Sequence, residues 1–429
     1  MLLVGSTSLC ASIYLGFSMK HLFIVLALVL GVTTGATAQE SRTLDQVLQL
    51  AFANSAELAA AERSVAAQEA LIASQYSLED PMVGVSSLDR GNVTKYGVIS
   101  QRLRFPVKYY LQGKAQRSRA SSSSSMWAMK KYSLRKQVVS LYFSIFSTQK
   151  IIQLTKANMD AVREFARVAE KKYAAGRTSQ SDSMKAHFEQ TRLELDLLRL
   201  QQKENSLQQQ LKAVVGDPAM GSLDLANLEL APPVFQLSRM AEGGDSSSHS
   251  TSPELQVQAA RLEAAKWKSQ LAAWEFAPDI QLQYQTRIEG NPQDSEIYSI
   301  SLSVPLFFWK KSAEASAASA EKAAEEYRLT DATNRVVTRS KDLQGQVQLG
   351  EKTLKIYQTS LIPQAQGAYN SSRASYRANK TSFLDLLDSE RSLYQVKTDY
   401  YRSLEQFVAS LADLEATLGK SLSNLGDVK

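Results

Sequence analysis

YAAGRTSQSD, residues 173–182, recurs as YRANKTSFLD, residues 376–385. Both copies contain a tyrosine, a basic residue, the dipeptide Thr-Ser and an aspartate, and each matched pair is 203 residues apart. Gly176 and Asn379 are residue types that tolerate the left-handed backbone at a helix C-terminus, so each copy is predicted to form the tip of a helical hairpin. The serine three residues before each aspartate is a predicted N-cap of the returning helix. The chain is therefore predicted to be a duplicated unit.

The segments on both sides of the two tips have the composition of long helices. Beyond their first residues, segments 106–175 and 305–378 contain a single proline, Pro363. At about 1.5 Å per residue, some seventy helical residues would extend on the order of 100 Å, so such helices must pack along other helices. The returning helices are predicted to end at Gly216 and Gly419. The second one contains a heptad-like seam: Leu393, Val396, Tyr400, Leu404, Phe407, Leu411, Leu414 and Leu418.

Strand periodicity follows Pro81 and Pro278, which are 197 residues apart. Apolar and polar residues alternate over 280–284, which is typical of a strand with one apolar face. We expect one strand pair in residues 82–105 and another in residues 279–304. An ordinary half-exposed sheet in a soluble domain would have the same pattern. Four strands are too few to close a membrane barrel, so either the chain oligomerises or the strands do not span.

Aromatic residues cluster at the ends of both predicted strand pairs, as they do at the boundaries of a membrane. They are Phe105, Tyr109, Tyr110, Trp274, Phe276, Phe307, Phe308 and Trp309. A basic run also follows the first pair: Arg102, Arg104, Lys108, Lys114, Arg117 and Arg119. These cations are predicted either to meet anionic headgroups or to form a solvated helix start.

The N-terminal region has the pattern of a secretory signal. A short basic start after Met19, an apolar run and Ala-Thr-Ala precede Gln39, where we expect the mature chain to begin. Cys10, the only cysteine, lies in the removed segment, so no disulfide and no lipidated N-terminal cysteine are expected. The 49 basic and 43 acidic residues are interspersed, unlike those of a nucleic-acid-binding protein. No mature stretch has the roughly twenty apolar residues of a membrane-spanning helix.

These features divide the chain into five parts. We expect a signal region at 1–38, a first repeat at 39–217, a linker at 218–251, a second repeat at 252–419 and a C-terminal tail at 420–429. Each repeat is predicted to contain a helix, a strand pair and a long helical hairpin. The first helix is expected over residues 43–76.

The order of these elements resembles the TolC-like outer membrane factors, or outer membrane efflux proteins. The resemblance runs from Thr43-Leu44-Asp45 through both strand pairs to both tips. It implies a mainly α-helical fold with a small transmembrane β part, in which three copies form a 12-stranded β-barrel continued by a periplasmic α-barrel. The implied function is a passive exit duct in the outer membrane of a Gram-negative bacterium. The duct would dock to a periplasmic adaptor and to an inner-membrane pump, and the resemblance implies a pump of the resistance-nodulation-division class.

The resemblance also implies functional residues at the hairpin tips. A periplasmic constriction would be lined by Asp385 and Asp388, which share one helix face and would form two carboxylate rings in a trimer. The residues implied in adaptor docking are Tyr173, Gly176, Arg177, Tyr376, Asn379 and Lys380. From the residues alone, Asp385 could instead complete a capping box with Ser382, and Asp388 could pair with Arg391.

Other functions stay open at this stage. One is an exit duct for type I secretion, and another is a soluble periplasmic coiled-coil adaptor or scaffold. An adaptor normally has a single hairpin between β-rich domains, whereas this chain has two equivalent hairpins. Catalysis is not expected, because the mature chain offers only His187 and His249 and no cysteine for a zinc site or a nucleophile–base pair. No cofactor or resident metal is predicted.

Overall fold

The computed structural model describes residues 43–89, 93–176, 179–216, 251–290, 296–304 and 306–422. The predicted signal region 1–38, nearly all of the predicted linker 218–251 and most of the tail 420–429 lie outside the described residues.

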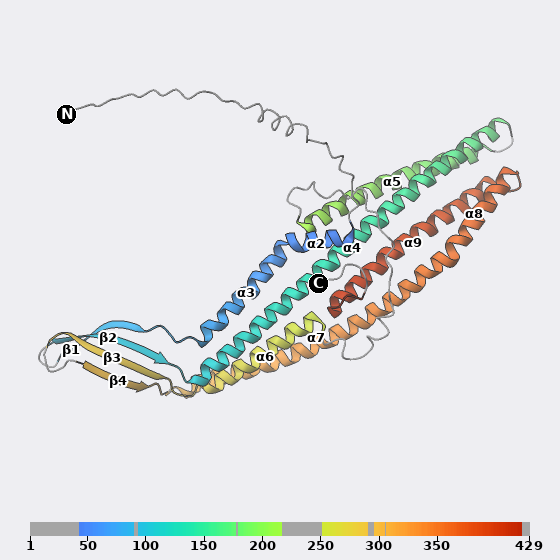
Figure 1. Ribbon diagram of the computed structural model, residues 1–429. Helices are drawn as coiled ribbons and strands as arrows, with labels where there is room; N and C mark the ends of the chain where they lie inside the picture. Colours follow the sequence, from blue (N-terminus) through green and yellow to red (C-terminus); the bar gives the residue numbers. More distant parts are fainter. Residues whose placement is uncertain are drawn as a thin grey trace, which may run out of the picture. The chain divides into compact units, whose positions relative to one another are not determined.

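Four antiparallel strands form one sheet in the order β1-β2-β3-β4 (Figure 1). They are β1 (Met82–Asp89), β2 (Val93–Leu103), β3 (Ile280–Glu289) and β4 (Glu296–Leu302). The strands lie within the residues predicted for the two pairs, and pairing of β2 with β3 joins the two repeats. The sheet is therefore built from both halves of the sequence.

One face of the sheet carries an apolar row that crosses all four strands. Val83 opposes Ile99, Ile99 opposes Tyr284, and Tyr284 opposes Tyr298. Because side chains alternate between the faces of a strand, directly opposed residues share a face. Val83 is 78% exposed and Tyr298 is 74% exposed, so this apolar row has no cover within the described part of the chain.

The first repeat contains four helices, of which two replace a single predicted one. They are α2 (Leu44–Asn54), α3 (Ala56–Tyr76), α4 (Pro106–Ala174) and α5 (Gln180–Val215). The helix expected over 43–76 is broken at Ser55, whose extended backbone ends α2. The Ser55 hydroxyl accepts a hydrogen bond from Leu58 N at 3.2 Å and so caps α3.

The second repeat follows the same plan with one irregularity. Its helices are α6 (Pro253–Trp274), α7 (Phe308–Ile356), α8 (Ile362–Arg377) and α9 (Phe383–Leu418). A π-helical segment, η4 (Tyr357–Leu361), joins α7 to α8 directly ahead of Pro363. Proline has no backbone N–H and crowds the preceding turn, so a widened turn keeps the long helix continuous.

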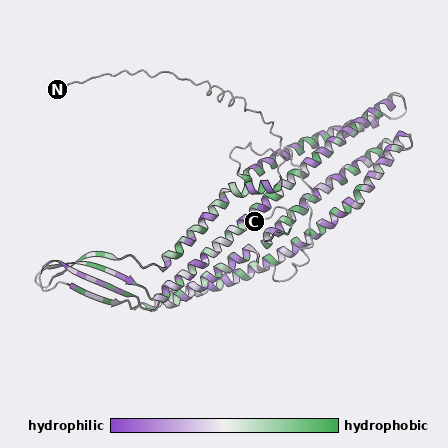
Figure 2. Cartoon of the chain, viewed as in Figure 1, coloured by the Kyte–Doolittle hydropathy of each residue, from purple (hydrophilic) through white to green (hydrophobic). Residues whose placement is uncertain are grey.

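The long helices pack through a shared apolar core. The core joins α2, α4, α5, α7 and α9 and includes Val138, Tyr142, Leu211 and Val347. The predicted seam on α9 contributes Leu404, Phe407, Leu411, Leu414 and Leu418. Figure 2 shows hydrophilic and hydrophobic residues mixed along these helices, and among the residues described above no helix has the length and apolar character to cross a bilayer.

Candidate functional site

Both predicted tips have the backbone that the sequence indicates. Gly176 has a φ of 67° and Asn379 a φ of 58°, and Asn379 is the only non-glycine residue with positive φ among those described. The amide of Gly176 donates to the carbonyl of Tyr173 at 2.8 Å, and the amide of Lys380 donates to the carbonyl of Ser375 at 2.8 Å. These bonds satisfy carbonyl groups at the ends of α4 and α8, so each chain reversal is well defined.

The two tips differ in how their tyrosines are placed. Tyr173 is 47% exposed, whereas Tyr376 is 5% exposed. The Lys172 ammonium lies 3.8 Å from the centre of the Tyr376 ring and donates to the Tyr376 carbonyl at 3.1 Å. An apolar cluster of both repeats surrounds Tyr376: Phe165, Ala166, Ala169, Ala186, Phe383, Leu386 and Leu387. The two hairpins are therefore fastened to each other near their tips. Arg177 lies outside the described residues.

Asp385 is used locally as a helix cap. Its Oδ2 accepts hydrogen bonds from Thr381 Oγ1 at 2.8 Å, Ser382 Oγ at 2.8 Å and Ser382 N at 3.2 Å. The amide of Asp385 donates back to Ser382 Oγ at 3.2 Å, which completes the capping box expected from the residues alone. The bonds from Ser382 and Thr381 hold the pKa of the Asp385 carboxyl below its ordinary value.

Asp388 makes a much weaker local contact. Its Oδ1 lies 3.9 Å from Nη1 of Arg391, and 68% of its side chain is exposed. Arg391 bonds instead to the buried carboxylate of Glu189 on α5. The carboxylate of Asp388 is therefore less engaged within the chain than that of Asp385.

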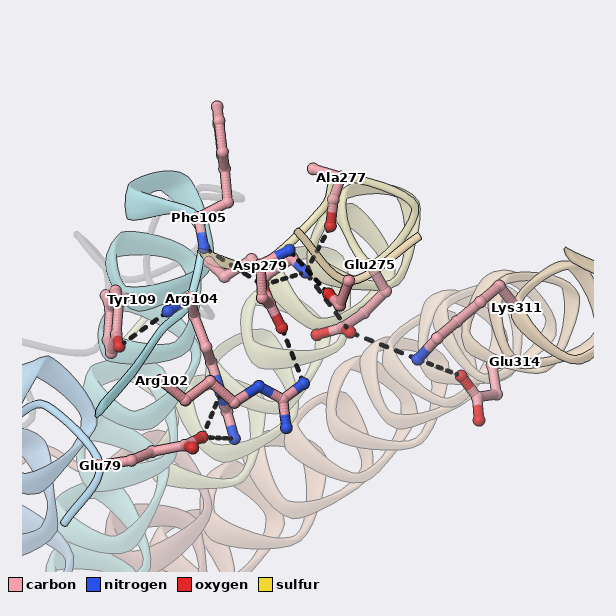
Figure 3. Close-up of polar contacts among 12 residues, drawn as sticks. Glu79, Arg102, Arg104, Phe105, Tyr109, Glu275, Ala277, Asp279, Lys311 and Glu314 are labelled. Carbon is pink, nitrogen blue, oxygen red and sulfur yellow. Dashed lines mark hydrogen bonds and ion pairs between the residues drawn. The ribbon is translucent and has the colours of Figure 1, made fainter. Parts of the chain in front are cut away.

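The junction between sheet and helices holds a second polar site (Figure 3). Lys108 Nζ lies 2.8 Å from Asp279 Oδ1 and donates to the carbonyl of Ala277 at 2.8 Å. Nη2 of Arg102 donates to Asp279 Oδ2 at 2.8 Å. Burial alone would raise the pKa of Asp279, but hydrogen bonds from Lys108, Arg102 and a backbone amide hold it below its ordinary value.

This network corrects the prediction for part of the basic run. Arg102 and Lys108 bind Asp279, and Arg104 lies 2.7 Å from Glu79, so these three cations are neutralised within the chain. Sequence reasoning missed both acids, because neither belongs to a motif and Asp279 is distant from Lys108 in the sequence. The only available signal was a lone acid, Asp279, directly before a strand whose first residues are uncharged.

The predicted interface aromatics gather at the same end of the sheet. Register places Leu103, Ile280 and Leu302 side by side, and the aromatics flank these strand ends. Phe105 stacks on Trp274, with ring centres 5.5 Å apart. The ring of Trp309 packs edge-to-face with those of Phe307 and Phe308, with ring centres 5.2 Å and 5.4 Å apart. Exposed members include Tyr110, Phe276, Phe307, Phe308 and Trp309. The hydroxyl of Tyr109 accepts a hydrogen bond from the amide of Arg104 at 3.1 Å, which fixes the position of this ring.

The described residues contain no group of three or more His, Cys, Asp or Glu side chains placed to hold a metal ion. His187 instead contacts Glu170 at 2.8 Å, which links α5 to α4.

Comparisons with known proteins agree with this architecture. Residues 246–420 match the family model for outer membrane efflux protein. The cobalt-zinc-cadmium resistance protein CzcC of Cupriavidus metallidurans is 24% identical over 396 residues, covering 88% of this chain and 90% of that protein. The structure is similar to that of CusC, with a TM-score of 0.76, 16% identity and coverage of 88% and 92%. It is also similar to the outer membrane protein VceC of Vibrio cholerae, with a TM-score of 0.75, 14% identity and coverage of 89% and 97%.

Proposed function

We propose that this chain is a member of the outer membrane efflux protein family and forms the outer-membrane channel of a tripartite efflux system. The observation that carries this function is the pairing of two equivalent helical hairpins with one open sheet of four strands. A periplasmic adaptor, the competing function, is not built in this way. The cargo would pass through the channel while an inner-membrane pump supplies the energy.

A homotrimer is supported by surfaces that the single chain leaves uncovered. In the described part of the chain, β1 and β4 each have only one strand neighbour. Unpaired backbone groups cost several kcal/mol each in hydrocarbon, so strand edges inside a bilayer must be closed by other copies. Three copies supply twelve strands. The helices also leave an apolar surface for another copy to cover. It is a stripe of exposed side chains on α5, formed by Met184, Phe188, Leu195 and Leu198.

The hairpin tips are the proposed contact with the adaptor. Tyr173 and Lys380 are exposed there, at the end of each hairpin most distant along α4 and α8 from the sheet. Asp388 is the proposed constriction acid, with Asp385 beside it as a capped neighbour. The similarity to the cobalt-zinc-cadmium resistance protein CzcC favours divalent metal ions as cargo, and the family resemblance set out above favours a pump of the resistance-nodulation-division class.

One pair of variants tests whether the strands lie in the membrane and which face of the sheet points to lipid. Ile300 is 78% exposed on the apolar face of β4, and Ser299 lies next to it on the opposite face. Ile300→Lys should reduce the amount of trimer recovered from outer membranes, because a lysine facing lipid costs up to about 2–4 kcal/mol, depending on its depth in the bilayer. Ser299→Lys should assemble normally and change single-channel conductance. Recovery of the unmodified protein as a soluble periplasmic monomer would contradict the proposal.

A further inference from the structure

A cavity of about 180 Å³ lies between the two hairpins, on the side of the core toward the tips. Residues of α4, α8 and α9 line it, including Leu154, Asn158, Tyr369, Glu390, Leu393 and Tyr394. Its lining combines apolar and aromatic side chains with the carboxyl group of Glu390, the amide groups of Asn158 and Gln366, and the ammonium group of Lys397. Such a lining is typical of a small-molecule site, in which a few polar groups fix the orientation of the ligand.

Two of these polar groups, those of Asn158 and Glu390, have atoms without a hydrogen-bond partner within the described residues. Asn158 is 6% exposed, and neither its Oδ1 nor its Nδ2 has a hydrogen-bond partner. Glu390 is 5% exposed, and its Oε2 has no partner either. A buried polar atom without a partner costs free energy, so three such atoms on two lining residues indicate a bound group that supplies their hydrogen bonds.

A second buried carboxylate lies near Glu390. The buried carboxylate of Glu189 is the main neighbouring charge, and it bonds to Arg391 and lies 3.6 Å from Arg192. Burial, followed by the charge of Glu189, raises the pKa of Glu390 to about 8, and Arg391 opposes this rise. A cation beside Glu390 would replace the proton that the carboxyl otherwise keeps.

Two other polar groups of the lining, those of Lys397 and Tyr394, are already engaged. Lys397 donates to Gln366 Oε1 at 3.1 Å and lies seven residues, or about 10 Å, along α9 from Glu390. The Tyr394 hydroxyl lies 2.9 Å from Thr155 Oγ1. Among the described residues that line the cavity, only Asn158 and Glu390 have buried polar atoms without a hydrogen-bond partner.

We propose that this cavity binds a small primary amine that also carries a hydroxyl or carbonyl oxygen, a ligand of the size of ethanolamine. The ammonium group would donate to the carboxylate of Glu390 and to Asn158 Oδ1. The ligand oxygen would accept from Asn158 Nδ2, and the carbon atoms would contact Leu154 and Leu393. A metal ion fits less well, since the described residues form no cluster of three ligating side chains. This proposal does not depend on the channel function.

Binding should be coupled to the release of a proton. The amine requires ionised Glu390, so affinity should rise between about pH 6 and pH 8 and then level off. The charged and titratable groups around Glu390 are Glu189 and Arg192 on α5, Tyr369 on α8, and Asp388, Arg391, Tyr394 and Lys397 on α9.

Titration calorimetry on the full-length protein in detergent tests the site with three probes. Ethanolamine should bind, ethylamine should bind several-fold more weakly, and ethylene glycol should not bind. Glu390→Gln should weaken ethanolamine binding at least about 10-fold, because a charge-assisted hydrogen bond is lost. Asn158→Ala should remove the difference between ethanolamine and ethylamine. Glu351→Gln, which removes an exposed carboxylate on α7, should bind like the unmodified protein.

Elution volume and melting temperature show whether each variant is folded. If Glu390→Gln does not assemble, the unmodified protein still decides the question. Its binding heat should differ between two buffers of different ionisation enthalpy, as proton release requires. No binding of ethanolamine, equal binding of ethylene glycol, or unchanged affinity in folded Glu390→Gln would overturn the proposal.

Discussion

Lys108 Nζ lies 2.8 Å from Asp279 Oδ1, with only 2% and 7% of the two side chains exposed. Lys108 begins the long helix of the first repeat, and Asp279 precedes the first strand of the second. This buried ion pair therefore joins the two repeats at the point where the sheet meets the helices. It also fixes the amide of Phe105, which donates to the same Oδ1 at 3.3 Å.

Lys108→Met should destabilise the protein, because it leaves the buried charge of Asp279 with Arg102 alone. Removing one partner of a buried pair costs about 3–5 kcal/mol. The measurement is the unfolding free energy of the purified protein in denaturant. Lys341→Met, which removes an exposed lysine on α7, serves as the control and should change little. A combined Lys108→Met and Asp279→Asn variant should lose less than the sum of the single losses; full additivity would show that the two side chains do not interact.

Glu390→Gln should make stability less sensitive to alkaline pH. A carboxyl whose pKa rises from 4.5 to about 8 on folding favours the folded state at low pH, and that advantage is lost as pH rises through this window. Each pH unit in the window costs up to about 1.4 kcal/mol. The variant should match the unmodified protein near pH 5 and exceed it near pH 8 in melting temperature, measured without added amine. A variant that is less stable at both values would show that the carboxylate is stabilised by its surroundings.

Asp388→Asn and Asp385→Ala should separate two roles that share one helix face. Asp388 makes only a 3.9 Å contact with Arg391, so its loss should reduce the cation preference of single channels and leave the melting temperature nearly unchanged. Asp385 completes the cap of α9, so Asp385→Ala should speed amide hydrogen exchange in the first turn of that helix. Unchanged conductance and ion preference in Asp388→Asn would remove this acid from the proposed constriction.

The elements that the sequence predicts well depend on local backbone chemistry. Gly176 and Asn379 mark the tips because few residue types accept positive φ, and Gly419 ends α9 for the same reason. The break at Ser55 was not predicted, since a serine within an amphipathic pattern is compatible with one continuous helix. The π-helical segment before Pro363 was also missed, because proline indicates a disturbance without specifying how the chain absorbs it.

The sites outside the tips depend on contacts that sequence spacing does not reveal. Asp279 and Lys108 are 171 residues apart, and their pairing follows only from the alignment of β2 with β3. In the sequence, Glu390 is an acid on a helix with the basic residues Arg391 and Lys397 nearby. Many solvent-exposed acids on helices have such neighbours, so the sequence does not set Glu390 apart. Its burial results from packing of α9 on α4, so no periodicity in α9 alone could identify it.

Gly350 and Gly345, five residues apart on α7, provide a matched test of helix packing. A Cβ added at Gly350 would lie 2.8 Å from Cδ2 and 3.2 Å from Cβ of Phe407, which is 2% exposed. Gly350→Ala should therefore cost about 1–3 kcal/mol through overpacking of α7 against α9. At Gly345 no atom lies within 4 Å, so Gly345→Ala should stabilise the helix by about 0.5–1 kcal/mol. Denaturant unfolding of both variants measures the change in the free energy of unfolding, which should be a loss for Gly350→Ala and a gain for Gly345→Ala. Stabilisation by Gly350→Ala would mean that α7 and α9 lie farther apart than the contact with Phe407 requires.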